Sequence, residues 1–201
     1  NHSKYGGAIY SYVLGKEMMN INLYIPSVLT WKEKSLKLRM TTDYPEHGKV
    51  VIKLEETSKE PLTINLRRPV WAAGDVAIRI NGSKQKVESV PGSFISLHRK
   101  WKKNDVIELI LPMPLYTVSM PDNVDRRAVF YGPTILAGTF GTEKRKMGDI
   151  PVFVSEEKSL TNYIKKISDT SVSFVTTLPG GPDNVKMLPF YKVADENQTV
   201  Y

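Results

Sequence analysis

The chain has 201 residues, 41% of them hydrophobic, and a formal net charge of +7 from 28 Lys and Arg against 21 Asp and Glu. A chain of this length buries roughly 70% of its unfolded surface, so the composition excludes a disordered protein. It has no cysteine, which excludes disulfides and thiol nucleophiles within these residues, and no apolar run approaches the ~20 residues that cross a bilayer.

The first 16 residues predict a helix. Tyr5, Ala8, Ile9, Tyr12 and Val13 recur at the spacing that places side chains on one helical stripe. Such a stripe has to bury against a partner. We therefore expect residues 1–16 to pack against something other than the strands that follow.

Residues 17–142 predict an antiparallel β-sandwich. Apolar residues alternate with polar ones in successive short runs, and turn signals such as "DYPEHGK", "INGSK" and "VPGS" separate these runs. The alternating sets are Leu36, Leu38 and Met40; Val50, Ile52 and Leu54; Leu62, Ile64 and Leu66; and Val76, Ile78 and Ile80. Short strands at this spacing are typical of a sandwich or barrel and not of parallel βαβ units.

A hairpin is predicted next. Ile95 and Leu97 alternate before the basic run "HRKWKKND", and a second apolar strand follows until Pro112 and Pro114 end it. We expect the two strands to pair, with Trp101 packed at their end.

Residues 143–201 predict a smaller β-rich appendix that packs on the sandwich. The segment "EEKSLTNYIKKIS" carries Leu160, Tyr163, Ile164 and Ile167 at helical spacing, which predicts one short amphipathic helix. The segments "SVSFVTTL" and "VKMLPFYKV" predict strands.

No pattern in the chain indicates catalytic or metal-binding residues. The three histidines, His2, His47 and His98, lie far apart, and no pair has the spacing of metal ligands. Carboxylates that are adjacent in a strand point to opposite faces, so they do not form the facing pair of a glycosidase. The basic clusters favour solvated loops, with a polyanion site as the alternative.

The tryptophans leave two interpretations open. Trp31, Trp71 and Trp101 each follow an apolar strand segment near a turn. Such a ring commonly closes the end of a core, and a flat exposed aromatic also suits the apolar face of a sugar. Trp31 and Trp101 are therefore candidate sugar-binding residues, and core packing is the alternative.

The order of several segments resembles a known enzyme family. These are "NHSKYGGAIYS", "INLYIPSVLTWKEKSLKLRMTTDYPEHGKVVIKL", "LRRPVWA", "IRINGS", "SFISLHRKWKKNDVIELILPMPL", "RRAVFYGPTILAG" and "MLPFYKV". Together they resemble the rear half of the β-L-arabinofuranosidase-like enzymes of glycoside hydrolase family 127. In that family an (α/α)6 barrel carries the active site, including a cysteine nucleophile and zinc ligands, and β-sandwich domains follow it.

The resemblance implies that residues 1–16 are the last helix of a barrel that is otherwise missing. The catalytic and zinc-binding positions of the family would lie before Asn1, so this segment would hold no catalytic residue, no metal and no cofactor, with zinc belonging to the parent enzyme. His2 and Tyr5 would lie nearest to the active-site end, which makes them candidate substrate-binding residues.

We therefore expect a non-catalytic β-sandwich region of an enzyme that acts on L-arabinofuranosides or related plant glycans. The alternative is an autonomous carbohydrate-binding module that uses exposed Trp and Tyr. The expected partners are the missing barrel and a plant-derived oligosaccharide, with no nucleic acid and no membrane. We also expect a weak homodimer through the orphaned helix, and a periplasmic or secreted parent.

Overall fold

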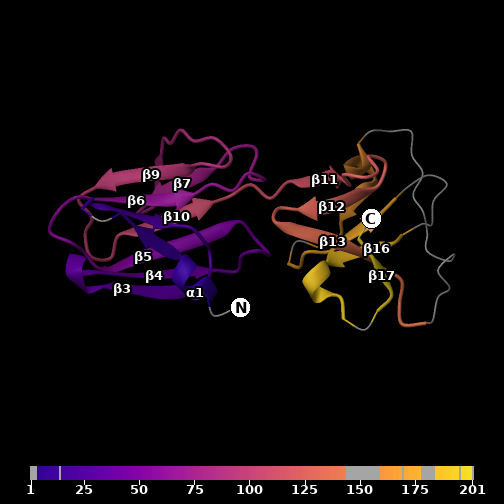
Figure 1. The fold of residues 1–201 in the computed structure, drawn as a ribbon, viewed down its shortest axis with the longest axis horizontal. Coiled ribbons are helices and arrows are strands. Elements are labelled where there is room, and N and C mark those ends of the chain that lie inside the picture. Colours follow the sequence, from indigo (N-terminus) through magenta and orange to yellow (C-terminus); the bar gives the residue numbers. More distant parts are fainter. Residues whose placement is uncertain are drawn as a thin grey trace. The chain divides into compact units, whose positions relative to one another are not determined.

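The computed structural model describes residues 4–13, 15–143, 159–168, 170–177, 184–194 and 196–200. The chain forms two compact units, which we call unit 1 (Asn1–Met113) and unit 2 (Pro114–Tyr201) (Figure 1). Within these described residues the regular elements are mostly strands, which confirms the mainly β class and the sandwich predicted from the sequence. No helix in the described residues is long and apolar enough to span a bilayer.

Unit 1 contains two sheets. The first has four strands in the order β1-β2-β6-β9, and the second has six in the order β3-β4-β5-β10-β7-β8. The strands of the first sheet are β1 Tyr10–Tyr12, β2 Met18–Ile21, β6 Leu62–Arg67 and β9 Phe94–Arg99. Those of the second are β3 Ser27–Trp31, β4 Leu36–Thr42, β5 Lys49–Glu56, β7 Ala77–Ile80, β8 Ser83–Gln85 and β10 Val106–Ile110. A short 3-10 turn, η1 (Lys32–Lys34), joins β3 to β4.

The alternating residues of unit 1 form its core. One cluster of buried side chains draws members from both sheets, including Leu38 and Ile52 from one and Ile64 and Leu97 from the other. Because alternate residues of a strand face opposite sides, the apolar sets read from the sequence point inward together. At about 25 cal/mol per Å² of apolar surface, this burial is the main stabilising term of the unit.

Unit 2 is one sheet with the order β11-β12-β13-β16-β15-β14, and β17 pairs with β13 beside it. The strands are β11 Leu115–Ser119, β12 Arg127–Tyr131, β13 Thr134–Thr139, β14 Ile164–Lys166, β15 Phe174–Thr176, β16 Lys186–Pro189 and β17 Gln198–Thr199. The turns η3 (Leu160–Tyr163) and η4 (Phe190–Lys192) complete the described elements. A smaller buried cluster around Leu136 and Phe174 forms its core.

The opening helix is much shorter than predicted. Helix α1 spans Lys4–Ala8, and the chain then continues as strand β1, which pairs antiparallel with β2. The adjacent Gly6 and Gly7 disfavour a helix, and the aromatic and β-branched residues that follow favour a strand. The residues of the expected stripe therefore do not share one face, because Ile9 is buried in the core and Tyr12 is exposed.

The predicted hairpin of β9 and β10 is wrong. Strand β9 pairs with β6, whereas β10 pairs with β5 and β7 in the other sheet. The basic run between them therefore crosses from one sheet to the other, and each strand turns its apolar face to the shared core.

Within the described residues of the last third, a 3-10 turn and a strand stand in place of the expected amphipathic helix. Leu160–Tyr163 form a 3-10 turn, and Ile164–Lys166 form a strand that pairs with β15. The β-branched Ile164 completes this edge of the sheet. The two compact units divide at Met113/Pro114, beside Pro112.

Candidate functional site

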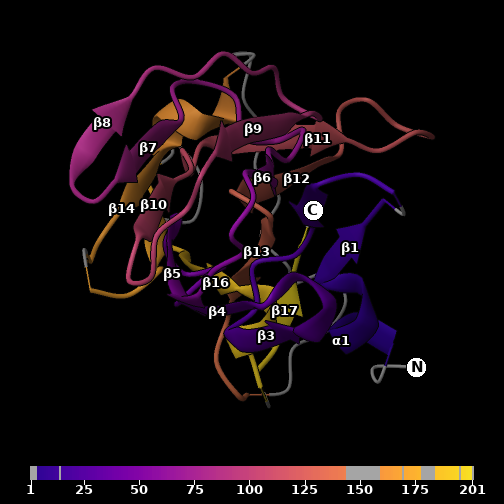
Figure 2. The same ribbon diagram turned by 90° about the vertical axis from the view of Figure 1, so that its left-hand side faces the viewer.

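An aromatic pair lies where strands β1 and β3, the edges of the two sheets of unit 1, come together. The rings of Tyr12 and Trp31 have centroids 5.1 Å apart and planes inclined by 35°. A hydrogen bond of 2.9 Å between Tyr10 Oη and Ser27 Oγ joins the same two strands, and helix α1 lies beside them (Figure 2). Burial raises the pKa of Tyr10 above its ordinary value, while this bond lowers it. We call this region the aromatic edge.

The two rings of the aromatic edge differ in access. Tyr12 is 57% exposed, whereas Trp31 is half-buried and packs against the core. Because the planes are inclined, the rings do not form one flat platform. A sugar at this edge would stack mainly on Tyr12, with Trp31 supporting that ring.

Trp101 is a core residue. Its side chain is 3% exposed, and its indole N–H donates a 2.8 Å hydrogen bond to the carbonyl of Leu62. The guanidinium of Arg99 lies 5.3 Å from the ring centroid. No face of the ring is open to a sugar, so the structure places Trp101 in the core that the sequence offered as the alternative.

Trp71 belongs to a second aromatic group, at the end of unit 1 where β4 turns into β5. Tyr44 stacks on Trp71 with centroids 6.3 Å apart, and it meets Tyr24 edge-on at 6.0 Å. The hydroxyl of Tyr24 donates a 2.5 Å hydrogen bond to the carbonyl of Arg67. Burial raises the pKa of Tyr24, and Tyr44 adds to this effect while Arg67 opposes it. These rings fix the loops at this end.

Arg68 connects two loops at the same end. The buried guanidinium donates to the carbonyls of Ala72, Gly74 and Ser89 and to the Ser89 hydroxyl, over distances of 2.5 to 3.1 Å. These bonds use all five N–H groups of the side chain. Arg68 is therefore a structural clamp and has no donor left for a ligand.

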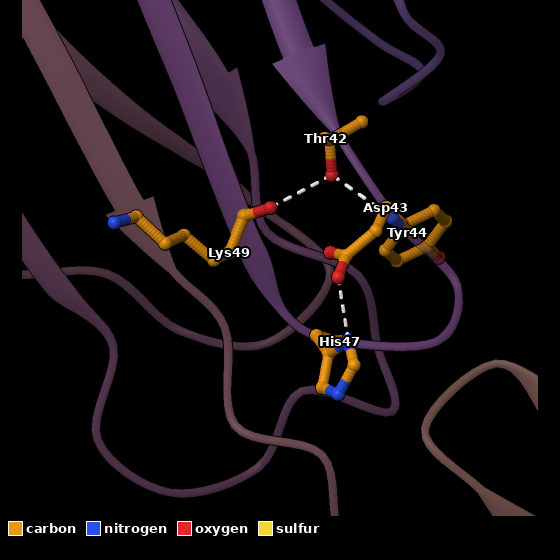
Figure 3. Close-up of polar contacts among 5 residues, drawn as sticks. All are labelled: Thr42, Asp43, Tyr44, His47 and Lys49. Atoms are coloured by element: carbon orange, nitrogen blue, oxygen red, sulfur yellow. Dashed lines mark hydrogen bonds and ion pairs between the residues drawn. The ribbon is translucent and has the colours of Figure 1, made fainter. Parts of the chain in front are cut away.

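His47 lies in the turn between β4 and β5 (Figure 3). Its Nδ1 is 2.5 Å from a carboxylate oxygen of Asp43, and both side chains are exposed. Thr42 Oγ1 donates to the carbonyl of Lys49 at 2.7 Å and accepts from the N–H of Tyr44 at 3.0 Å. These contacts close the turn.

Two carboxylates of unit 1, those of Glu55 and Asp105, make structural bonds. Glu55 accepts from Arg39 at 2.7 Å and pairs with Lys37 at 3.3 Å, and the Arg39 hydrogen bond is the main cause that lowers its pKa. Burial raises the pKa of Asp105, but hydrogen bonds from Asn81 and from the N–H of Lys102 outweigh it, so the pKa lies below its ordinary value.

The described residues do not fit a zinc site. Over this part of the chain no three His, Asp or Glu side chains converge to hold a metal ion, and the sequence has no cysteine to add. His2, the first candidate of the sequence, lies outside the described residues. Tyr5 is exposed on α1, and His98 bonds Thr63 Oγ1 at 2.9 Å on the outer face of its sheet.

Sequence reasoning therefore identified Trp31 but not its partner. The spacing in the sequence places Tyr12 on a predicted helical stripe, and only the strand pairing of β1 brings it to Trp31. The sequence signal is the pair Gly6 and Gly7, which disfavour a helix and lie near the end of the short α1.

One family model matches part of the chain. A family model described as "Beta-L-arabinofuranosidase, GH127 middle domain" matches residues 18–113. A search of curated proteins gave no match.

Solved structures share the fold over 90 to 98% of this chain. One, described as a glycoside hydrolase, matches with TM-score 0.67 and 21% identity over 90% of this chain. A GH127 beta-L-arabinofuranosidase from Geobacillus stearothermophilus T6 matches with TM-score 0.67 and 18% identity over 98%. A GH127 beta-arabinofuranosidase matches with TM-score 0.63 and 20% identity over 92%. This chain spans 34 to 35% of the length of these proteins. Residues 18–113, the bulk of unit 1, therefore match the model of the GH127 β-L-arabinofuranosidase middle domain.

Proposed function

We propose that this chain is a non-catalytic β portion of a glycoside hydrolase that acts on L-arabinofuranosides or related plant glycans. The match of residues 18–113 to the GH127 middle domain carries this proposal. The commitment of Glu55 and Asp105 to structural bonds agrees with a supporting role. Any zinc of the complete enzyme is then expected among residues of a catalytic barrel, which is also the expected partner.

The test is hydrolysis of p-nitrophenyl β-L-arabinofuranoside with added zinc. The isolated chain is compared with the product of the complete reading frame, and a GH127 arabinofuranosidase serves as the positive control. We expect turnover by the reading-frame product alone. Turnover by the isolated chain contradicts a non-catalytic role, and turnover by neither protein contradicts the arabinofuranoside as substrate.

The aromatic edge supports a second candidate function, which is glycan binding by the chain itself. The observation in its favour is the exposed ring of Tyr12 backed by Trp31. Tyr12→Ala is expected to lower the affinity for arabinan oligosaccharides in calorimetric titration at least tenfold, because stacking of a sugar on the ring is lost. Tyr191→Ala in unit 2, where the tyrosine is similarly exposed, is the matched control. Equal affinity of both variants contradicts this function.

A further inference from the structure

A second surface of unit 1 carries a cluster of basic and polar side chains that neither the fold nor the aromatic edge explains. A groove of about 440 Å³ runs along β9 and the segment that follows β8. Strands β8 and β9 are the edges of their respective sheets, so the groove lies where both sheets end on the same side. We call it the β9 groove. Its polar lining consists of Gln85, Lys86, Ser96, His98, Arg99 and Lys100.

The lining brings together two basic segments that are distant in the sequence. Lys86 comes from one wall, and Arg99 and Lys100 come from the other. None of these three cations has a carboxylate within ion-pair distance among the described residues, whereas Lys34, Lys37, Arg39 and Lys49 do.

The acidic groups nearby offset only part of this charge. Asp105 attracts Arg99 and so offsets its charge, which leaves Lys86 and Lys100 as the unpaired cations of the groove among the described residues. Glu88 is exposed and lines a neighbouring groove. Like charges held together in a concave surface raise the local potential, and a bound anion relieves it.

The shape and the uncharged groups of the groove narrow the choice of anion. Its volume lies within the roughly 300–1,000 Å³ of ordinary ligand sites. The lining contains no aromatic side chain, so nucleic-acid bases would have nothing to stack on. Gln85, Ser96 and His98 offer amide, hydroxyl and imidazole groups, which suit the hydroxyls of a sugar.

We propose that the β9 groove binds a carboxylate-bearing oligosaccharide, that is, a stretch of a uronic-acid glycan. Lys86 and Lys100 would pair with the carboxylates, and Gln85, Ser96 and His98 would bind hydroxyls. The choice of a saccharide over other polyanions rests on the proposed function in glycan breakdown. The assignment of the groove as an anion-binding site rests only on the geometry given above.

The experiment is calorimetric titration of the full chain at low salt with trigalacturonate, a neutral arabino-oligosaccharide and an oligonucleotide of equal charge. The variant Lys86→Gln with Lys100→Gln removes two groove cations, and Lys32→Gln with Lys53→Gln removes two exposed cations elsewhere in unit 1. Far-UV circular dichroism verifies that both fold. We expect trigalacturonate to bind, the groove variant to bind about tenfold more weakly, and the control variant to bind as the parent does.

Three results would overturn the proposal. They are no binding of trigalacturonate at low salt, equal weakening in both double variants, and tighter binding of the neutral sugar. Binding of the oligonucleotide in preference to trigalacturonate, with the same loss in the groove variant, would replace the saccharide by a nucleic acid. Because the readout is binding and not hydrolysis, failure here is distinct from failure of the proposed function.

Discussion

Replacing Trp101 with alanine distinguishes the two interpretations of this residue, core packing and sugar binding. The side chain is 3% exposed, and an indole of this kind buries about 200 Å², which at about 25 cal/mol per Å² corresponds to ~5 kcal/mol. The substitution also removes the donor to the carbonyl of Leu62. We expect Trp101→Ala to lower the free energy of unfolding of unit 1 by ~3–5 kcal/mol. Trp101→Phe keeps most of the ring and is expected to cost ~1–3 kcal/mol, the cost of the unpaired carbonyl.

Urea unfolding followed by tryptophan fluorescence measures this difference. All three tryptophans lie in unit 1, so the two that remain report that unit alone. A parallel titration with arabinan oligosaccharides gives the glycan affinity of each variant. A change below about 1 kcal/mol together with loss of glycan affinity would refute the core assignment and restore Trp101 as a sugar-binding residue.

Three further substitutions, one of them with a matched control, test other parts of unit 1. Arg68→Met leaves the carbonyls of Ala72, Gly74 and Ser89 without their donors from Arg68, so a loss of about 3 kcal/mol or more in urea unfolding is expected, and a loss below about 1 kcal/mol would show that the clamp is dispensable. Gly48→Ala would place a Cβ 2.1 Å from the carbonyl oxygen of Leu111, so we expect a lower melting temperature and a cost of ~1–3 kcal/mol. Gly6→Ala, with no atom within 4 Å of the new Cβ, is its control and should change stability by less than about 1 kcal/mol, in the stabilising direction. The pKa of Asp105 is lower in the folded chain than its ordinary value, so its ionised carboxylate stabilises the fold at neutral pH. This stabilisation is lost as the pH falls below about 4 and through the folded pKa. Asp105→Asn should flatten the acid limb of stability against pH, and an unchanged acid limb would contradict the assignment.

The strands of the core were predictable because their apolar residues alternate without interruption. Leu36, Leu38 and Met40 read as one inward face, and all three are buried. The pairing of strands was not predictable in the same way. The sequence places β9 directly before β10, but nothing in "HRKWKKND" indicates that this run crosses between sheets.

The contacts within the candidate sites were not predictable from the sequence either. Trp31 and Trp101 stand in similar contexts in the sequence, yet one supports an edge and the other lies in the core. The β9 groove depends on the meeting of Lys86 with Lys100, which are brought together by strand order and not by spacing along the chain. The division at Pro114 had a sequence signal, namely the two prolines there, but they were read only as the end of a strand.

The parallel pairing of β2 with β6 has a consequence for how unit 1 forms during synthesis. Asn20 and Asn65 are partners across this pair, 45 residues apart, and their amides join at 2.7 Å. Strands β3, β4 and β5 of the second sheet intervene in the sequence, so β1 and β2 leave the ribosome well before the strand on which they dock. Loop closure of this length slows folding. The hairpin of β1 and β2 is therefore expected to dock on β6 late in the folding of unit 1.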